Sequence, residues 1–227
     1  MKLSHPLCLA QNEGKIMEKK YINLCFRDLL VFALILILVS CFIPEKFTAK
    51  IEINNDGSYS FIYDGILTHA FSKAAILEGP LSKKDEAEMK KIENEFNIEL
   101  EFKKANYIGN GQFEVLYEKT GKAGESFYFF DEQYSFFSIV YTKSDTIEVS
   151  GFQLDKESLA QMEQMKLKID GEFEILTDAT VSKHNSNAKV KKIKDMDQYK
   201  WDIKSNLDPA PYMLLTYKKV EVEETTD

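Results

Sequence analysis

The chain has 227 residues and a net charge of −8, with 44% hydrophobic and 12% aromatic side chains. This composition supports a packed core and excludes a wholly disordered chain. Arg27 is the only arginine, so the acidic remainder lacks the guanidinium groups that bind phosphates in a bidentate way. Both features argue against nucleic acid as a partner.

The first 40 residues have the pattern of a secretory signal. An unbroken apolar run covers residues 29–39, which is shorter than the roughly 20 residues that a membrane-spanning helix needs. Lys19, Lys20 and Arg27 precede the run and supply the positive region of such signals. Residues 1–16 lack this pattern, so we expect translation to begin at Met17.

The apolar run ends in Leu38, Val39, Ser40 and Cys41. These residues match the lipobox of bacterial lipoproteins. The resemblance implies cleavage after Ser40, a diacylglycerol thioether on Cys41 and often a further acyl chain, such as palmitate, on the new amino terminus. Cys41 is also the last cysteine of the chain, so a protein cut there can form no internal disulfide. The alternatives are an uncleaved membrane helix and an ordinary signal peptide that ends at a cysteine by chance.

The residue that follows Cys41 bears on location. Phe42 stands where Gram-negative lipoproteins of the inner membrane commonly have aspartate. The resemblance therefore implies the periplasmic face of the outer membrane if the organism is Gram-negative. We expect a lipid-anchored protein of the bacterial cell envelope.

The remainder indicates one exported domain over 47–219, preceded by a lipidated tether over 41–46 and followed by an acidic, disordered tail over 220–227. A hairpin is predicted first, over 47–66. Apolar residues alternate with polar ones from Ala49 to Ile53, and the next turn contains Asp56-Gly57, a dipeptide that tolerates positive φ.

Helix signals occur in three places. Residues 68–78 favour a short helix, and a longer one over 82–97 begins with Ser82 and Asp85, which resemble a capping box. Its apolar residues Met89, Ile92 and Phe96 fall on one face. A further helix is predicted after Asp155, with Leu159, Met162 and Met165 on one face.

Strand patterns separated by turns fill the other segments. The predicted strands begin near Ile98, Phe113, Phe127, Phe136, Thr146, Leu167, Tyr199 and Met213. We interpret Asp170-Gly171 as a turn or bulge and residues 182–197 as a loop. The expected fold class is α+β, with an antiparallel sheet of hairpins arranged as a meander and about two helices packed on one face.

Catalytic and metal-binding motifs are absent from the sequence after Cys41. It holds two histidines, His69 and His184, which read as surface residues, and no zinc, EF-hand, nucleophile-elbow or P-loop motif. Ser182, His184 and Asp178 lie too close in sequence to indicate a catalytic triad. We therefore predict a non-enzymatic protein without cofactor or metal.

Aromatic side chains concentrate in residues 127–141. Consecutive aromatic positions make both faces of a strand apolar, so one face packs on the core and the other needs a cover. If a ligand is the cover, the candidate groove residues for a lipid-like molecule are Phe127, Phe129, Phe137 and Tyr141. If the chain itself is the cover, the segment is a strand buried on both sides.

Several short motifs resemble bacterial lipoproteins related to the LppM domain. They are Asp56-Gly-Ser-Tyr59, the run 171–179, Tyr199-Lys-Trp201-Asp-Ile203 and Pro209-Ala-Pro211. The resemblance implies a lipid-anchored α+β domain that binds lipid or envelope components, and it supplies no catalytic residues. Asp178, Asn185 and Trp201 match its pattern; from the residues alone, the first two are turn formers and Trp201 is a core residue.

These observations together predict a membrane-anchored envelope lipoprotein that binds a lipid or another envelope component, including an envelope protein. Two alternatives stay open. One is an envelope hydrolase with an unrecognised site, and the other is a protein-interaction or assembly factor that works through a sheet edge.

Overall fold

The computed structural model describes residues 42–130, 132, 135–143 and 145–218. The predicted signal over 1–40, the cleavage and lipidation site at Ser40 and Cys41, and the predicted tail over 220–227 lie outside the described residues.

The larger of two sheets has seven strands in the order β10-β11-β8-β1-β2-β4-β3. Its strands are β1 (Phe42–Ile53), β2 (Tyr59–His69), β3 (Phe102–Gly109), β4 (Gln112–Gly121), β8 (Asp170–Thr177), β10 (Lys191–Ile193) and β11 (Met196–Ile203). Neighbouring strands pair antiparallel except for β1 and β8, which run parallel. This parallel pair joins the first hairpin to the C-terminal half of the domain.

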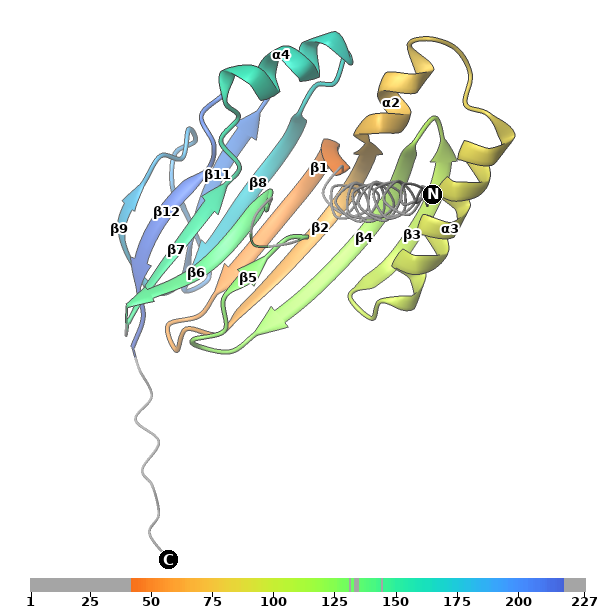
Figure 1. The fold of residues 1–227 in the computed structure, drawn as a ribbon. Coiled ribbons are helices and arrows are strands. Elements are labelled where there is room, and N and C mark those ends of the chain that lie inside the picture. Colours follow the sequence, from red (N-terminus) through yellow and green to blue (C-terminus); the bar gives the residue numbers. More distant parts are fainter. Residues whose placement is uncertain (1–41, 131, 133–134, 144, 219–227) are drawn as a thin grey trace, which may run out of the picture. The chain divides into compact units, whose positions relative to one another are not determined.

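The smaller sheet has five strands in the order β5-β6-β7-β12-β9. They are β5 (Phe127–Tyr128), β6 (Phe137–Lys143), β7 (Thr146–Gly151), β9 (Thr180–His184) and β12 (Tyr212–Thr216). The sheet lies over β8, β1 and β2 of the larger one (Figure 1). Aromatic rings fill the space between the sheets, because Phe137 of β6 stacks on Phe173 of β8 with centroids 4.9 Å apart.

Three helices occur in the described part of the chain: α2 (Ala70–Ile76), α3 (Lys83–Ile98) and α4 (Lys156–Gln164). The predicted capping box opens α3, since the Ser82 hydroxyl accepts from the Asp85 amide and the Asp85 carboxylate accepts from the Ser82 amide. The helix lies along β3 and β4 (Figure 1), where Phe96 stacks on Phe102 at 4.5 Å. The predicted α+β class, with antiparallel pairing and few helices packed against a sheet, is confirmed.

The first hairpin is confirmed and is longer than predicted. β1 and β2 pair from Phe42↔His69 to Ile53↔Tyr59, and Gly57 in the connecting turn has a φ of +85°. A Cβ at Gly57 would lie 2.6 Å from the ring of Tyr217, so both conformation and space require glycine there.

Two local predictions are wrong. Ile98 and Leu100 are 79% and 85% exposed, because α3 continues through Ile98 and β3 begins only at Phe102. Asp170 and Gly171 start strand β8 instead of forming a turn. Gly171 leaves room for the Phe47 ring, since a Cβ there would lie 2.7 Å from it.

Three larger features also differ from the prediction. Residues 42–46, expected within the tether, belong to β1, and the Phe42 side chain is 7% exposed. The segment 182–197, expected as a loop, contains the end of β9, all of β10 and the start of β11. The strands form two sheets instead of one meander, because the apolar face of β8, β1 and β2 is covered by the aromatic side chains of the smaller sheet.

Candidate ligand cleft between the two sheets

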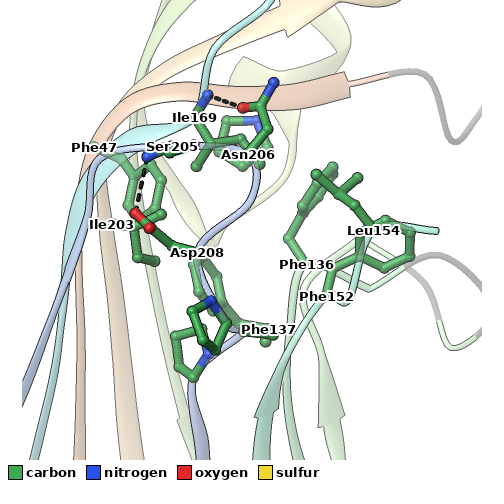
Figure 2. A pocket seen from close by; sticks show the side chains of 15 residues that line it. Phe47, Phe136, Phe137, Phe152, Leu154, Ile169, Ile203, Ser205, Asn206 and Asp208 are labelled. Atoms are coloured by element: carbon green, nitrogen blue, oxygen red, sulfur yellow. Dashed lines mark hydrogen bonds between the residues drawn. The ribbon is translucent and has the colours of Figure 1, made fainter. Parts of the chain in front are cut away.

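A cleft lies between the two sheets at the end of the domain where β1 begins. The loop that joins β11 to β12 forms one wall, and β6 and the residues after β7 form the other (Figure 2). The lining residues are Pro44, Phe47, Phe136, Phe137, Gly151, Phe152, Leu154, Ile169, Ile203, Ser205, Asn206, Asp208, Pro209, Ala210 and Pro211.

The walls of the cleft are largely apolar. Figure 2 shows Phe136, Phe152 and Leu154 grouped on one side, away from Phe47 and Ile203. The Phe136 and Phe152 rings meet edge to face, with centroids 5.6 Å apart. Phe152 is 38% exposed, so part of this apolar wall faces solvent in a place where an apolar ligand could cover it.

The polar side chains of the lining hold the β11–β12 loop in shape. Asn206 accepts from the Ile169 amide at 2.7 Å and donates to the Leu167 carbonyl at 2.9 Å. The Asp208 carboxylate accepts from the Lys204 and Ser205 amides at 2.7 and 2.9 Å (the bond from Ser205 is dashed in Figure 2). These side chains therefore build the wall through hydrogen bonds to the backbone.

The cleft is nearly filled in this conformation. Its free space is about 40 Å³, room for a few water molecules but not for an acyl chain. A larger ligand therefore needs Phe136, Phe152 or the β11–β12 loop to move aside.

An ion pair lies near the cleft, at the start of β8. The ammonium group of Lys204 donates to the Asp170 carboxylate at 3.2 Å. This bond raises the pKa of the exposed Lys204 side chain. The pair is solvent-accessible and leaves the apolar character of the cleft unchanged.

The four aromatic residues predicted for a groove do not come together. Phe137 lines the cleft, whereas Phe127 and Phe129 are 6% and 1% exposed and pack in the core. Tyr141 lies elsewhere and donates its hydroxyl hydrogen to the Gly57 carbonyl; burial raises the pKa of its phenol. The segment is thus mostly covered by the chain itself, but it is not one strand buried on both sides, since β5 has two residues at the edge of the smaller sheet and β6 begins at Phe137.

His69 is a buried capping residue, which corrects its interpretation as a surface residue. Its side chain is 7% exposed, and Nδ1 accepts from the Ser72 amide at 3.3 Å at the start of α2. Burial lowers the pKa of His69, and the nearby Glu88 acts in the opposite direction. The neutral ring therefore serves the fold of this region, next to the first residue of β1.

His184 and its neighbours form no catalytic triad. His184 is exposed, and its Nδ1 lies 2.8 Å from the Ser186 hydroxyl. Ser182 donates to the Leu214 carbonyl at 3.0 Å instead. Within the described residues, no group of three or more His, Cys, Asp or Glu side chains is placed to hold a metal ion.

Most of the cleft could not be predicted from the sequence, because its residues come from segments far apart in the chain. Pro44 falls in the predicted tether, and Pro209 and Pro211 read only as a turn. Phe152 and Leu154 follow a strand and carry no motif. The one signal in the sequence is the apolar run Pro209-Ala210-Pro211, which marks a rigid apolar turn but does not show what it faces.

The fold and the cleft define an α+β domain of two sheets with an apolar cleft at one end. Among solved structures, the chain has a weak similarity to the NMR structure of the folded domain of the Mycobacterium tuberculosis LppM protein. The TM-score is 0.40 and the identity 11%, over 78% of this chain and 92% of that one. The predicted LppM resemblance is thus found only as a weak structural likeness.

No protein-family model matches the sequence, and comparison with curated proteins gives no match. Of the helices in the part of the chain that the structure describes, none has the length and apolar content needed to cross a membrane.

Proposed function

We propose that the protein is a bacterial cell-envelope lipoprotein, anchored by lipid on Cys41, whose domain binds an apolar ligand or another envelope component without catalysing a reaction. The observation that carries the anchor is the sequence Leu38-Val39-Ser40-Cys41 at the end of a short apolar run with positive residues before it. In a Gram-negative organism, Phe42 after the cysteine favours the outer membrane.

The composition of the cleft supports binding as the role of the domain. Its walls come from aromatic, aliphatic and proline side chains, and ligand sites are commonly apolar with few polar groups. The polar lining residues Asn206 and Asp208 are committed to backbone hydrogen bonds. A hydrocarbon chain or an apolar side chain of a partner is therefore the ligand chemistry that matches the lining, and the walls must move apart to admit it.

The anchor is tested by replacing Cys41. We expect Cys41→Ala to abolish incorporation of labelled palmitate and to move the protein out of the membrane fraction, because the thiol is the atom that receives the diacylglycerol. Cys25→Ala is the matched control and keeps both, since Cys25 lies within the signal. Unchanged palmitate labelling of Cys41→Ala would refute the lipoprotein assignment.

Ligand binding is tested by incubating the purified protein with a lipid extract, repurifying it and identifying retained lipid by mass spectrometry. We expect bound lipid in the native protein and several-fold less in Phe152→Asp, because a carboxylate is costly to bury in an apolar cleft. Ile62→Asp is the matched control, since Ile62 is 37% exposed, close to the 38% of Phe152, and lies outside the cleft. Retention of no lipid by the native protein contradicts a lipid ligand.

A further inference from the structure

The folded domain begins directly after the proposed lipidation site. Phe42, the residue bonded to Cys41, is the first residue of β1 and is 7% exposed. Its ring lies 5.4, 5.2 and 5.6 Å from the rings of His69, Phe96 and Phe113. A lipid on Cys41 would therefore be joined to a packed residue by a single peptide bond, with no tether that would allow the domain to move away from the bilayer.

Exposed apolar side chains gather at this same end of the domain. Phe71 and Leu77, in and just after α2, are 51% and 49% exposed, and Ile108 near the end of β3 is 51% exposed. Backbone hydrogen bonds hold α2 and the β3–β4 turn, in or beside which these side chains lie, next to the start of β1. Phe42 pairs with His69, which precedes α2, and the His69 amide donates at 2.8 Å to the carbonyl of Gly111 in the β3–β4 turn.

The first acidic group after Cys41 has its charge compensated within the domain. Glu45 is the first carboxylate after Cys41. It accepts from the Thr68 hydroxyl and the Gln112 amide, both at 2.5 Å, and lies 3.7 Å from the Lys73 ammonium. Its charge is thus compensated within the domain, which lowers its repulsion from phosphate headgroups.

The opposite end of α3 provides an internal comparison. Ile98 and Leu100 are 79% and 85% exposed, but they lie at the far end of α3 from α2 (Figure 1). A helix of 16 residues is about 24 Å long. Side chains of similar apolar character therefore stand at two well-separated ends of one domain.

We propose that the end of the domain formed by Phe71, Leu77 and Ile108 docks into the phospholipid bilayer that holds the Cys41 lipid. This inference rests on the proposed anchor. Partly exposed apolar residues beside an attached lipid add their own burial to the membrane affinity that the acyl chains supply. Docking also directs the cleft toward the bilayer, since Pro44 in its wall lies three residues after Cys41.

The test measures the depth of single residues in a membrane. The mature lipidated protein is reconstituted in vesicles of phosphatidylethanolamine and phosphatidylglycerol that contain lipids with brominated acyl chains as quenchers. Leu77→Cys and Leu100→Cys are each labelled with an environment-sensitive fluorophore; the Cys41 sulfur is a thioether and does not react. We expect strong quenching at Leu77→Cys and little at Leu100→Cys.

A second pair, Ile108→Cys and Ile98→Cys, repeats the comparison on other elements and guards against a local effect of one label. Equal quenching within both pairs, in protein that floats with the vesicles, overturns the docking and leaves the anchor intact. Failure of the purified mature protein to float with vesicles, together with absent palmitate labelling, overturns the anchor itself and the docking with it.

Discussion

Replacing Phe129 with alanine is expected to lower the free energy of unfolding by about 3–5 kcal/mol. The Phe129 side chain is 1% exposed, and its ring centroid lies 5.2, 5.0 and 5.1 Å from those of Phe61, Tyr63 and Tyr117. Alanine would leave a cavity among rigid rings on β2 and β4 that cannot collapse easily, and it would also remove the aromatic pairs.

The measurement is denaturant-induced unfolding followed by tryptophan fluorescence and circular dichroism. Ile98→Ala is the control, because its side chain is 79% exposed and a surface change of this kind stays within about 0.5 kcal/mol. The result also separates the two interpretations of the aromatic segment. If the Phe129→Ala protein were as stable as the native one but retained less lipid, Phe129 would be assigned to a ligand groove instead of the core.

Local patterns predicted the elements that depend on neighbouring residues. The β1–β2 hairpin follows from alternation and the Asp56-Gly57 turn, and α3 follows from its capping box and apolar face. In both cases the interactions that define the element lie within a few residues in sequence. Such signals do not depend on the rest of the fold, so the sequence alone predicts these elements.

The arrangement of the strands depends on contacts between distant segments. β1 pairs with β8 in parallel through Lys46↔Asp170 to Ile53↔Thr177, and nothing in either segment specifies the other as its partner. The division into two sheets has the same origin. Alternating and continuous apolar patterns show that a face is buried, but they do not identify the covering element.

The candidate cleft illustrates this limit. Phe47, Phe152 and the β11–β12 loop become neighbours only when β1, β7 and β11 are placed in two facing sheets. The aromatic segment predicted apolar surface that needs a cover, but it left open whether chain or ligand supplies that cover. The structure places Phe127 and Phe129 against chain and Phe137 at the cleft.

Trp201→Ala is expected to lower the free energy of unfolding by about 3–5 kcal/mol. Trp201 on β11 is 2% exposed, and its ring lies 5.4 Å from that of Phe173 on β8. Its indole Nε1 donates to the Asn185 side-chain oxygen at 2.8 Å. Trp201 therefore fills the larger sheet's inner face and also contacts the segment that follows β9 of the smaller sheet.

Asn185 extends this contact between the two sheets. Its side-chain oxygen also accepts from the Tyr212 amide at the start of β12, and its side-chain nitrogen donates to the Ala210 carbonyl, both at 2.8 Å. Because the chain carries one tryptophan, unfolding of Trp201 variants is followed by circular dichroism.

Trp201→Phe separates packing from the hydrogen bond, because phenylalanine retains much of the buried ring but has no donor. We expect the missing hydrogen bond to cost about 0.5–1.5 kcal/mol, because the Asn185 oxygen still accepts from the Tyr212 amide. If the bond to Asn185 stabilises the contact between the sheets, Trp201→Phe and Asn185→Ala will be less than additive when combined, with a coupling of about 0.5–3 kcal/mol. Full additivity would assign the stability of Trp201 to packing alone, and the contact between the sheets would then depend on the aromatic core that contains Phe129.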